Sequence, residues 1–516
     1  MARVRHDVWN LGAGWSEPLL WYAKAVRAMQ ARPVTDPKSW RFQAAMHGMQ
    51  VALWTAIGVL KPGEALPDGP TQRKYWGQCQ HQTWYFLPWH RGYLAAFEGI
   101  CRADIVAAGG PADWALPYWN YNNPDVPQAN GLPPAFAATS LPDGSANPLF
   151  VERRYGDGEG PIVLDQRAIG LIALSDDQFT GGAEDVHPGF GGPTTLFHHG
   201  GEDRKPNGGL EGQPHNPVHG MVGGTRPGGR EDRAADGGLM SWPEMAALDP
   251  VFWLHHANID RLWEVWRQMD GHANPADAPW LRGPAGRAFV LPLASGADWT
   301  FTSKDVLDTT APDLDYQYED ISPPLTLSRL SQRMERLGVG GEEAQGAAVT
   351  TGGSTSELIG SNETSLSLQG AVAETAVRVD PAAAAAMSTA LDTLSPQMAR
   401  EPDRVFLKLE NIRGHNDSAV FYVYVGLAAD AKPDEHPELL AGTLSLFGVS
   451  KASDTSDGKG GNGIDQVFEI THVVDSLHMS DRLAGLSQLP VRFVANKSVG
   501  AESRISVGRV SLFRRR

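Results

Sequence analysis

Tryptophan divides this chain into two parts of different composition. All sixteen tryptophans lie at or before Trp299. The same part contains long stretches of helical periodicity, at Ser39–Val59, Pro88–Ala108 and Asp249–Met269, separated by loops rich in Gly and Pro. Because 516 residues are too many for one compact core, we expect two or three domains, with a mainly helical domain first.

Beyond this part the periodicity changes from helical to strand-like. Short β-branched or aromatic runs alternate with turn signals: VFLKLENI, AVFYVYVGL, GTLSLFGV, QVFEITHVV, PVRFVANKS and RISVGRVSLF. Residues from about 323 to 353 are small and polar, which is typical of a linker. We therefore expect a mainly α domain at 1–324, a connecting segment at 325–399 and a β-sandwich at 400–516.

Charge and cysteine content exclude several classes of protein. A formal charge of −16 argues against a nucleic acid or an anionic membrane as partner. With only two cysteines, a disulfide framework is excluded and a reducing compartment fits. The amino terminus lacks the apolar stretch of a secretory signal, and no apolar segment reaches the roughly 18 residues of a membrane span. We expect a cytoplasmic protein, and leave open whether identical chains assemble.

The first candidate metal-binding set is built around the segment CQHQTWYFLPWHRGYLAAFE, where His81 and His90 are nine residues apart. Nine residues rotate a continuous helix by about 900°, which places the two rings on opposite faces. Pro88 favours a helix that begins near it, with His81 on the preceding loop and His90 facing inward. His47, on another helical pattern, is the candidate third ring. A single histidine in such a context is more often a hydrogen-bonded core residue, so spacing alone only suggests this set.

The second candidate set begins in the segment EGQPHNPVHGM, where His215 and His219 are four residues apart. Four residues turn a helix by about 40°, so both rings can reach one ion. Pro217 falls within the first turn of such a helix, where its missing N–H costs little.

The third ring of the second set comes from LDPVFWLHHANIDRLWEVW, where Asp249 suits an N-cap and Pro250 the first helical position. The adjacent His255 and His256 point about 100° apart, so we expect only one of them to be a ligand. His256 shares the more hydrophobic stripe, and we choose it. His255 is then expected to support the site or the fold.

Sets made only of imidazoles suit zinc, copper, iron or nickel. A lone zinc ion on three histidines would leave half of the six without a role. Two sets of three histidines fit a dinuclear copper centre better.

Two long motifs resemble the signatures of tyrosinases and other type 3 copper proteins: H-x4-F-L-P-W-H-R-x2-L-x3-E at His81–Glu98 and D-P-V-F-W-x2-H-x3-D at Asp249–Asp260. More weakly, RVFLKLENI and FYVYVGL resemble the carboxy-terminal β-domain of plant-type polyphenol oxidases. The resemblance implies a four-helix bundle around two copper ions, CuA and CuB, that bind O2 as peroxide. It implies the ligands His47, His81 and His90 on CuA (the first set) and His215, His219 and His256 on CuB (the second set).

The resemblance also suggests roles for residues beside the ligands. Cys79 lies two residues before His81, where some relatives form a thioether to the histidine ring; an unmodified thiol is the equal alternative. Glu211 and Asn216 resemble a pair that orders a water able to deprotonate a monophenol, which must lose its proton to bind copper as phenolate. The alternatives are a solvated loop carboxylate for Glu211 and a cap or turn residue for Asn216.

Other residues near the two motifs are interpreted structurally. Arg91 and Asp260 are expected to form an ion pair between helices. The residue that shields CuB cannot be assigned among Met240, Trp242 and Pro243.

Taken together, the residues and the resemblance predict a tyrosinase, which uses O2 to hydroxylate monophenols and to oxidise o-diphenols to o-quinones. A catechol oxidase or o-aminophenol oxidase is the nearest alternative. A haemocyanin-like O2 carrier and a zinc hydrolase are more distant ones. The carboxy-terminal domain is expected to cover the copper site and keep the enzyme latent, with a stability or assembly module as the alternative.

Overall fold

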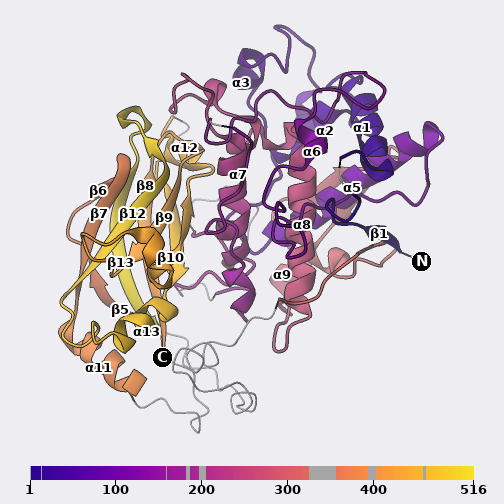
Figure 1. Cartoon of the computed structure of the whole chain (residues 1–516). Coiled ribbons are helices and arrows are strands. Elements are labelled where there is room, and N and C mark those ends of the chain that lie inside the picture. Colours follow the sequence, from indigo (N-terminus) through magenta and orange to yellow (C-terminus); the bar gives the residue numbers. More distant parts are fainter. Residues whose placement is uncertain are drawn as a thin grey trace.

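In a computed structural model, a helical region and a β-rich region lie side by side (Figure 1). The structure describes residues 2–12, 14–158, 160–181, 186–196, 205–324, 356–392, 403–456 and 461–515. We call residues 2–324 the helical region and residues 356–515 the β region. Helix α7 lies on the side of the helical region that faces the β region (Figure 1).

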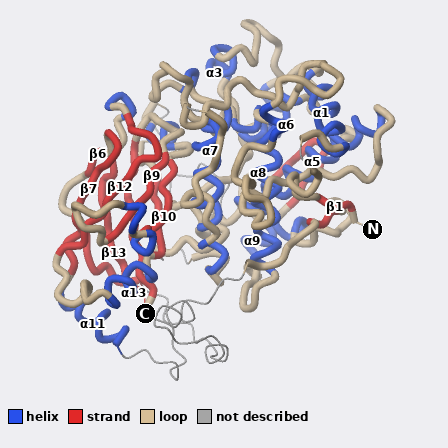
Figure 2. Tube along the Cα trace, viewed as in Figure 1, coloured by secondary structure: helices blue, strands red, loops and turns tan. Residues whose placement is uncertain are grey.

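The helical region is an assembly of helices joined by long loops (Figure 2). Its α-helices are α1 (Glu17–Gln30), α2 (Trp40–His47), α3 (Val51–Ala56), α4 (Gly69–Tyr75), α5 (Phe86–Ala107), α6 (Pro134–Ala137), α7 (Asn216–Gly223), α8 (Pro250–Arg267) and α9 (Ala278–Arg282). Short helical turns are η1 (Ile172–Ser175), η2 (Glu211–His215), η3 (Ala234–Asp236), η4 (Leu239–Ser241), η5 (Ala246–Leu248) and η6 (Ser303–Val306). Its strands are β1 (Arg3–Arg5), β2 (Phe289–Pro292), β3 (Asp298–Phe301) and β4 (Tyr316–Tyr318).

Local sequence signals explain where two of these helices begin. The Asp249 carboxylate accepts a hydrogen bond from the Val251 N–H at 2.9 Å, and Pro250 is the first residue of α8, so the predicted N-cap is confirmed. Helix α5 begins at Phe86, which puts Pro88 in its first turn and leaves His81 on the loop, as predicted.

The predicted continuous helix over Ser39–Val59 is wrong, because it is divided into α2 and α3 at Gly48. Gly48 is extended, and a Cβ at this position would lie 3.0 Å from the Pro243 carbonyl oxygen. The break therefore lets the 243–244 backbone approach the end of α2, where His47 lies.

The β region is one hydrogen-bonded sheet in the order β10-β9-β12-β7-β5-β13-β8-β11, with β6 paired to β13. Its strands are β5 (Ser356–Ser361), β6 (Leu366–Ser367), β7 (Gly370–Val379), β8 (Arg404–Arg413), β9 (Val420–Val425), β10 (Leu440–Ser445), β11 (Ile464–Glu469), β12 (Gln488–Val499) and β13 (Ser506–Arg515). Its helical elements are α11 (Pro381–Asp392), α12 (Val449–Ser453), α13 (Thr471–Met479), η7 (Pro433–Glu435), η8 (Pro437–Leu439) and η9 (Ala501–Ser503). Its edge strands β10 and β11 contact each other. A helical core is thus followed by a sheet-rich domain, as expected.

Two sequence expectations about the β region need correction. Strands β5, β6 and β7 lie within the predicted connecting segment 325–399, so the β region is under way by residue 356 and not at 400; residues 325–355 and 393–399 of that segment lie outside the described residues. The run QVFEITHVV is strand only to Glu469 and then enters α13.

Strand β1 pairs in parallel with β4, with Arg3 opposite Tyr316, so the two ends of the helical region lie together.

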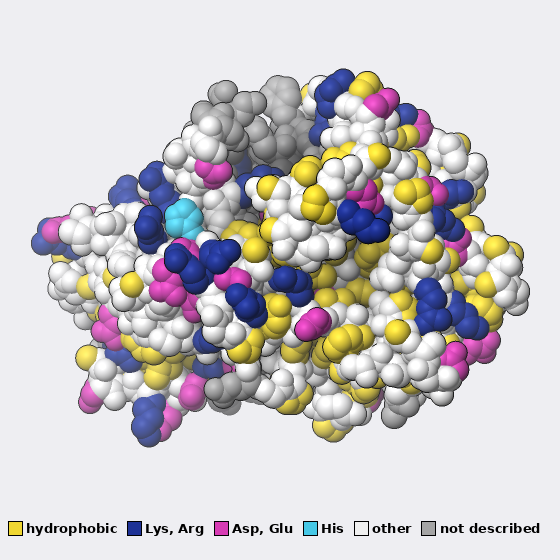
Figure 3. Space-filling model, turned by 90° about the horizontal axis from the view of Figure 1, so that it is seen from above, with side chains coloured by type: hydrophobic (Ala, Val, Ile, Leu, Met, Phe, Trp, Pro, Cys, Tyr) yellow, Lys and Arg dark blue, Asp and Glu magenta, His cyan; other side chains and the backbone are white. Residues whose placement is uncertain are grey.

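Basic and acidic side chains are interspersed on the face shown in Figure 3. Among the described residues, no helix has the length and apolarity needed to cross a membrane.

Candidate metal centre

Four helices and two adjoining turns bring the six predicted histidines into one buried site. His47 ends α2, His90 lies in the first turns of α5, His219 is on α7 and His256 is on α8. His81 is on the loop before α5, and His215 is the last residue of η2. Of the six, all except the partly buried His81 are at most 4% exposed.

In the first set, His47, His81 and His90 face one another at similar spacing. Their ring centroids are 5.5 Å (47–81), 5.9 Å (47–90) and 5.9 Å (81–90) apart. His47 Nδ1–H donates to the Pro243 carbonyl at 2.9 Å, and His90 Nδ1–H donates to the Phe86 carbonyl at 2.8 Å. A carbonyl can only accept, so each Nε2 keeps its lone pair for a metal ion.

In the second set, the three Nε2 atoms converge on one point. They are 3.2 Å (215–256), 3.2 Å (215–219) and 3.4 Å (219–256) apart. His219 Nδ1–H donates to the Met240 carbonyl at 2.8 Å, and His215 Nδ1 contacts Asn216 Oδ1 at 2.8 Å. With both Nδ1 atoms acting as donors, the Nε2 lone pairs of His215 and His219 face each other, and a cation between them removes this repulsion.

The two sets lie against each other as halves of one centre. The rings of His90 and His256 stack at 4.5 Å, and those of His81 and His215 are 5.9 Å apart. Burial lowers the pKa of His47 to about 4 and that of His215 to about 3. Burial also lowers the pKa of His90, His219 and His256, so these five rings are neutral near pH 7, as metal coordination requires.

The donor set fits two copper ions. Each half offers at least three imidazole nitrogens within 4.8 Å of one another, and imidazole suits copper. The buried Nε2 of His47 has no protein partner, which is the arrangement expected of a nitrogen reserved for metal. His47, His81 and His90 would hold one ion, and His215, His219 and His256 the other.

Sequence reasoning missed the role of the segment 240–243. Its main chain serves the site: the Met240 carbonyl orients His219 and the Pro243 carbonyl orients His47. One segment thus fixes a ring in each half. Every residue carries a carbonyl, so no side-chain pattern could have revealed these two acceptors.

Cys79 lies within reach of the first set. Its Sγ is 3.7 Å from both ring nitrogens of His81 and 3.4 Å from His90 Nε2. These distances place the thiol against the His81 ring, and the thioether stays a prediction. Cys101 is buried in the core, as expected.

Glu211 links the two halves through the backbone of the His81 loop. Its carboxylate accepts from the Gln82 N–H at 2.9 and 3.0 Å, and burial raises its pKa to about 8. It is buried, which argues against a solvated loop carboxylate. Asn216 directs its amide oxygen to His215, so it orients a predicted ligand, while its predicted role in ordering a water remains a prediction.

His255 is buried behind the second set. Its ring stacks on that of His215 at 5.3 Å with an interplanar angle of 23°. The close Nε2 contacts to His215 and His219 come from His256.

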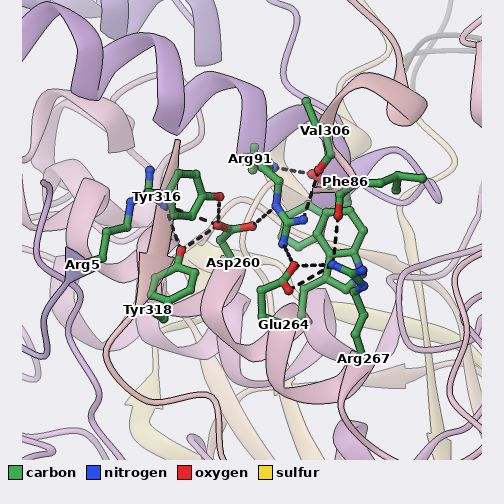
Figure 4. Close-up of polar contacts among 12 residues, drawn as sticks. Arg5, Phe86, Arg91, Asp260, Glu264, Arg267, Val306, Tyr316 and Tyr318 are labelled. Atoms are coloured by element: carbon green, nitrogen blue, oxygen red, sulfur yellow. Dashed lines mark hydrogen bonds and ion pairs between the residues drawn. The ribbon is translucent and has the colours of Figure 1, made fainter. Parts of the chain in front are cut away.

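The predicted ion pair between Arg91 and Asp260 is confirmed and is part of a larger buried network (Figure 4). Arg91 Nε lies 2.6 Å from Asp260 Oδ1, and its Nη2 lies 2.6 Å from Glu264. Asp260 also accepts from the hydroxyls of Tyr316 and Tyr318 at 2.5 and 2.6 Å. Because Arg91 follows His90 and Asp260 lies one turn after His256, the pair fixes the two histidine helices against each other.

Phe447 of the β region lies directly over the histidines. The predicted strand GTLSLFGV ends at Ser445, and Phe447 lies in the turn between β10 and α12. Its ring stacks on His219 at 4.2 Å and lies 5.8 Å from His81 and 6.1 Å from His215. One side chain thus contacts both halves. In the sequence, a Phe-Gly pair after an apolar run signals only a turn.

Comparison with known proteins agrees with this geometry. Residues 37–161 and 177–269 match the common central domain of tyrosinase, and residues 355–515 match a domain of unknown function, DUF7868. The chain is 31% identical to tyrosinase HcTyr1 of Hahella sp. (strain CCB-MM4), over 99% of both chains. It is 27% identical to a chloroplastic polyphenol oxidase of Malus domestica, over 78% of this chain and 62% of that protein.

Solved structures show the same fold over the whole chain. Latent apple tyrosinase superposes with a TM-score of 0.59 at 21% identity, covering 100% of this chain and 97% of that one. A latent aurone synthase superposes with a TM-score of 0.57 at 20% identity, covering 100% and 90%. The pairing of a helical core with a sheet-rich domain is therefore shared with these proteins.

Proposed function

Since this chain belongs to the tyrosinase family of copper-dependent oxidoreductases, we propose that it hydroxylates monophenols at the ortho position and oxidises o-diphenols to o-quinones. The observation that carries the proposal is the pair of facing histidine sets, each with at least three possible ligand atoms within 4.8 Å of one another. When bound, the copper pair supplies O2 activation and the capacity for two-electron oxidation.

The chain's own residues hold the rings and handle the proton. The carbonyls of Pro243, Phe86 and Met240 fix the tautomers of three ligands. Glu211 is the candidate acceptor for the phenol proton, because its raised pKa makes its carboxylate a better base than an exposed one. A catechol oxidase would share the histidines and differ at this step.

The test of the monophenolase step is a Glu211→Gln variant at full copper loading, assayed with tyrosine and with L-DOPA. We expect turnover of tyrosine to fall about 10²-fold, the scale of general base catalysis, and turnover of L-DOPA to fall much less. Glu374→Gln, at an exposed position on β7, is the control. If the wild-type protein oxidises L-DOPA but not tyrosine, the chain is better described as a catechol oxidase. Reversible O2 binding without phenol turnover would favour a haemocyanin-like O2 carrier.

We also propose that Phe447 keeps the enzyme latent. A phenol ring must approach both halves of the centre, and Phe447 occupies the space over His219 and His81. In a Phe447→Ala variant we expect phenol turnover to rise severalfold with copper content unchanged. Equal turnover in the two proteins would reject this role of Phe447. Leu446→Ala, at the neighbouring buried position, is the packing control.

The remaining expectations concern the cell. A cytoplasmic location is our proposal, tested by fractionation with marker enzymes. The association of identical chains is tested by sedimentation. A phenol and O2 are the proposed reaction partners.

A further inference from the structure

Strand β10 of the β region runs along the segment that carries the first two ligands of the second set. Thr443 N–H donates to Gln213 Oε1 at 3.1 Å, and Thr443 Oγ1–H donates to the Arg167 carbonyl at 2.9 Å. Two residues on, Ser445 Oγ–H donates to the Asn216 carbonyl at 3.0 Å. Thr443 and Ser445 are at most 2% exposed. These contacts are therefore buried parts of the interface, shielded from water.

The Ser445 contact continues to a predicted metal ligand. Asn216, whose carbonyl accepts from Ser445, holds His215 Nδ1 at 2.8 Å with its side-chain oxygen. A chain of two hydrogen bonds thus runs from the β region to His215. A buried partner of this kind fixes the orientation of an imidazole ring.

The fit on both flanks of this segment is close. A Cβ on Gly212 would lie 2.8 Å from Gln466 Nε2, and a Cβ on Gly220 would lie 3.0 Å from the Ser418 carbonyl oxygen. The helical region therefore presents bare backbone to the β region just before His215 and just after His219.

The first set has different supports. The carbonyls that orient His47 and His90 belong to Pro243 and Phe86, both within the helical region. The β region reaches this set through the Phe447 ring.

We infer that β10 is a permanent positioning element of the second histidine set, with Ser445 acting on His215 through Asn216. The β region then has two separable parts, a brace formed by Thr443 and Ser445 and a plug formed by Phe447. Substrate access needs movement of the plug alone. This inference rests on the proposed copper ligands.

The test uses the full chain loaded with copper and challenged with a chelator. The wild-type protein should retain two copper ions per chain, whereas Ser445→Ala should lose one of them at a chelator concentration 10–100-fold lower, the usual effect of removing a partner behind a metal ligand. Ser445→Thr keeps the hydroxyl and should restore retention. Ser511→Ala is the matched control, because it also removes a buried serine hydroxyl of the β region, bonded there to Glu410.

Two further variants identify the ion and separate the brace from the plug. In a His47→Ala background, where the second set is the intact one, Ser445→Ala should weaken retention of the remaining copper by the same factor. Phe447→Ala should retain both ions as the wild type does. Identical retention in Ser445→Ala and the wild type, or copper loss in Phe447→Ala equal to that in Ser445→Ala, would overturn the brace. A wild-type chain that binds no second copper would instead refute the proposed function.

Discussion

The two histidine sets have the same ligand type but different supports. The first set draws its orienting carbonyls from the helical region alone. In the second set, a carbonyl of the helical region orients His219, whereas His215 is held by hydrogen bonds that lead through Asn216 to β10. Two half-sites with the same ligands therefore depend on different parts of the molecule, and perturbing the β10 hydrogen bonds should affect the second set alone.

Removing one ligand from each set should produce the largest effect and tests whether the halves bind independently. In His47→Ala and in His219→Ala we expect copper per chain to fall from two to one and phenol oxidation to fall by more than about 100-fold, since even indirect partners of metal ligands are worth 10–100-fold. Metal analysis and an L-DOPA assay check this. If either variant lost both ions, the halves would not be separable.

The Arg91–Asp260 ion pair links a helix of the first set to a helix of the second, so breaking it should destabilise both halves together. Asp260→Asn leaves Arg91 and Arg5 buried with less compensating charge, so we expect unfolding to become easier by about 3–5 kcal/mol. Asp298→Asn, which breaks the partly exposed contact to Lys74, should cost about 1 kcal/mol or less. Urea denaturation of the two variants measures this, and equal costs would contradict the expected role of burial.

Weakening a contact between the two regions away from the copper site should show which histidine set depends on the β region. Glu231, on a loop of the helical region, accepts from Asn416 Nδ2 (3.1 Å), Gly500 N–H (3.0 Å) and Ser503 Oγ–H (2.7 Å) of the β region. We expect Glu231→Ala to cost about 1–3 kcal/mol, because three donors lose a charged acceptor. Thermal unfolding with copper analysis should show that the second ion is released first. Glu502→Ala, at an exposed position, is the control.

A graded effect of pH should act on the plug alone. Asp417 accepts from the Ser450 N–H at 2.8 Å, next to the turn that carries Phe447, and burial with the nearby Glu244 raises its pKa to about 8. For an acid whose pKa is raised on docking, the stabilisation is complete below about pH 4 and is lost as the pH rises to about 8. The docked plug should therefore weaken across this window, by no more than about tenfold per pH unit for one proton.

The measurement for Asp417 is the ratio of wild-type to Phe447→Ala turnover at each pH, which cancels the pH dependence of the chemistry. This ratio should rise from about pH 4 to about pH 8 in the chain with Asp417. With Asp417→Asn in both proteins, the ratio should be flat. A rise that persists with asparagine would assign the effect to another group.

Local rules account for what the sequence could predict about the site. Helical rotation and proline placement put His81 on a loop, and the Asp249 cap fixed the start of α8. The Arg91–Asp260 pair followed from two motifs that were assigned to facing helices. These features depend on residues within one or two turns of each other, or on pairs of opposite charge.

Contacts between distant segments could not be predicted. Phe447 and His219 meet because two regions dock, and no short-range pattern encodes their approach. Strands β5 and β7 lie in the predicted connecting segment, and β7 carries a weak strand signal because only two of its ten residues are buried and it lacks the buried aromatic residues of β9. Ser445 is one of two hydroxyl residues in an otherwise apolar strand, and its role depends on the carbonyl it faces.

The pairing of β1 with β4 has a consequence for how such a chain can be assembled. Arg3 lies opposite Tyr316, and Arg5 Nη1 donates to the Tyr318 hydroxyl at 2.9 Å, so the polypeptide enters and leaves the helical region at one edge. A unit closed on itself in this way tolerates circular permutation and the attachment of another module without rethreading. A gene encoding such a unit can therefore exchange its downstream module without rethreading the helical region, as long as the new module replaces the β10 contacts to the second set.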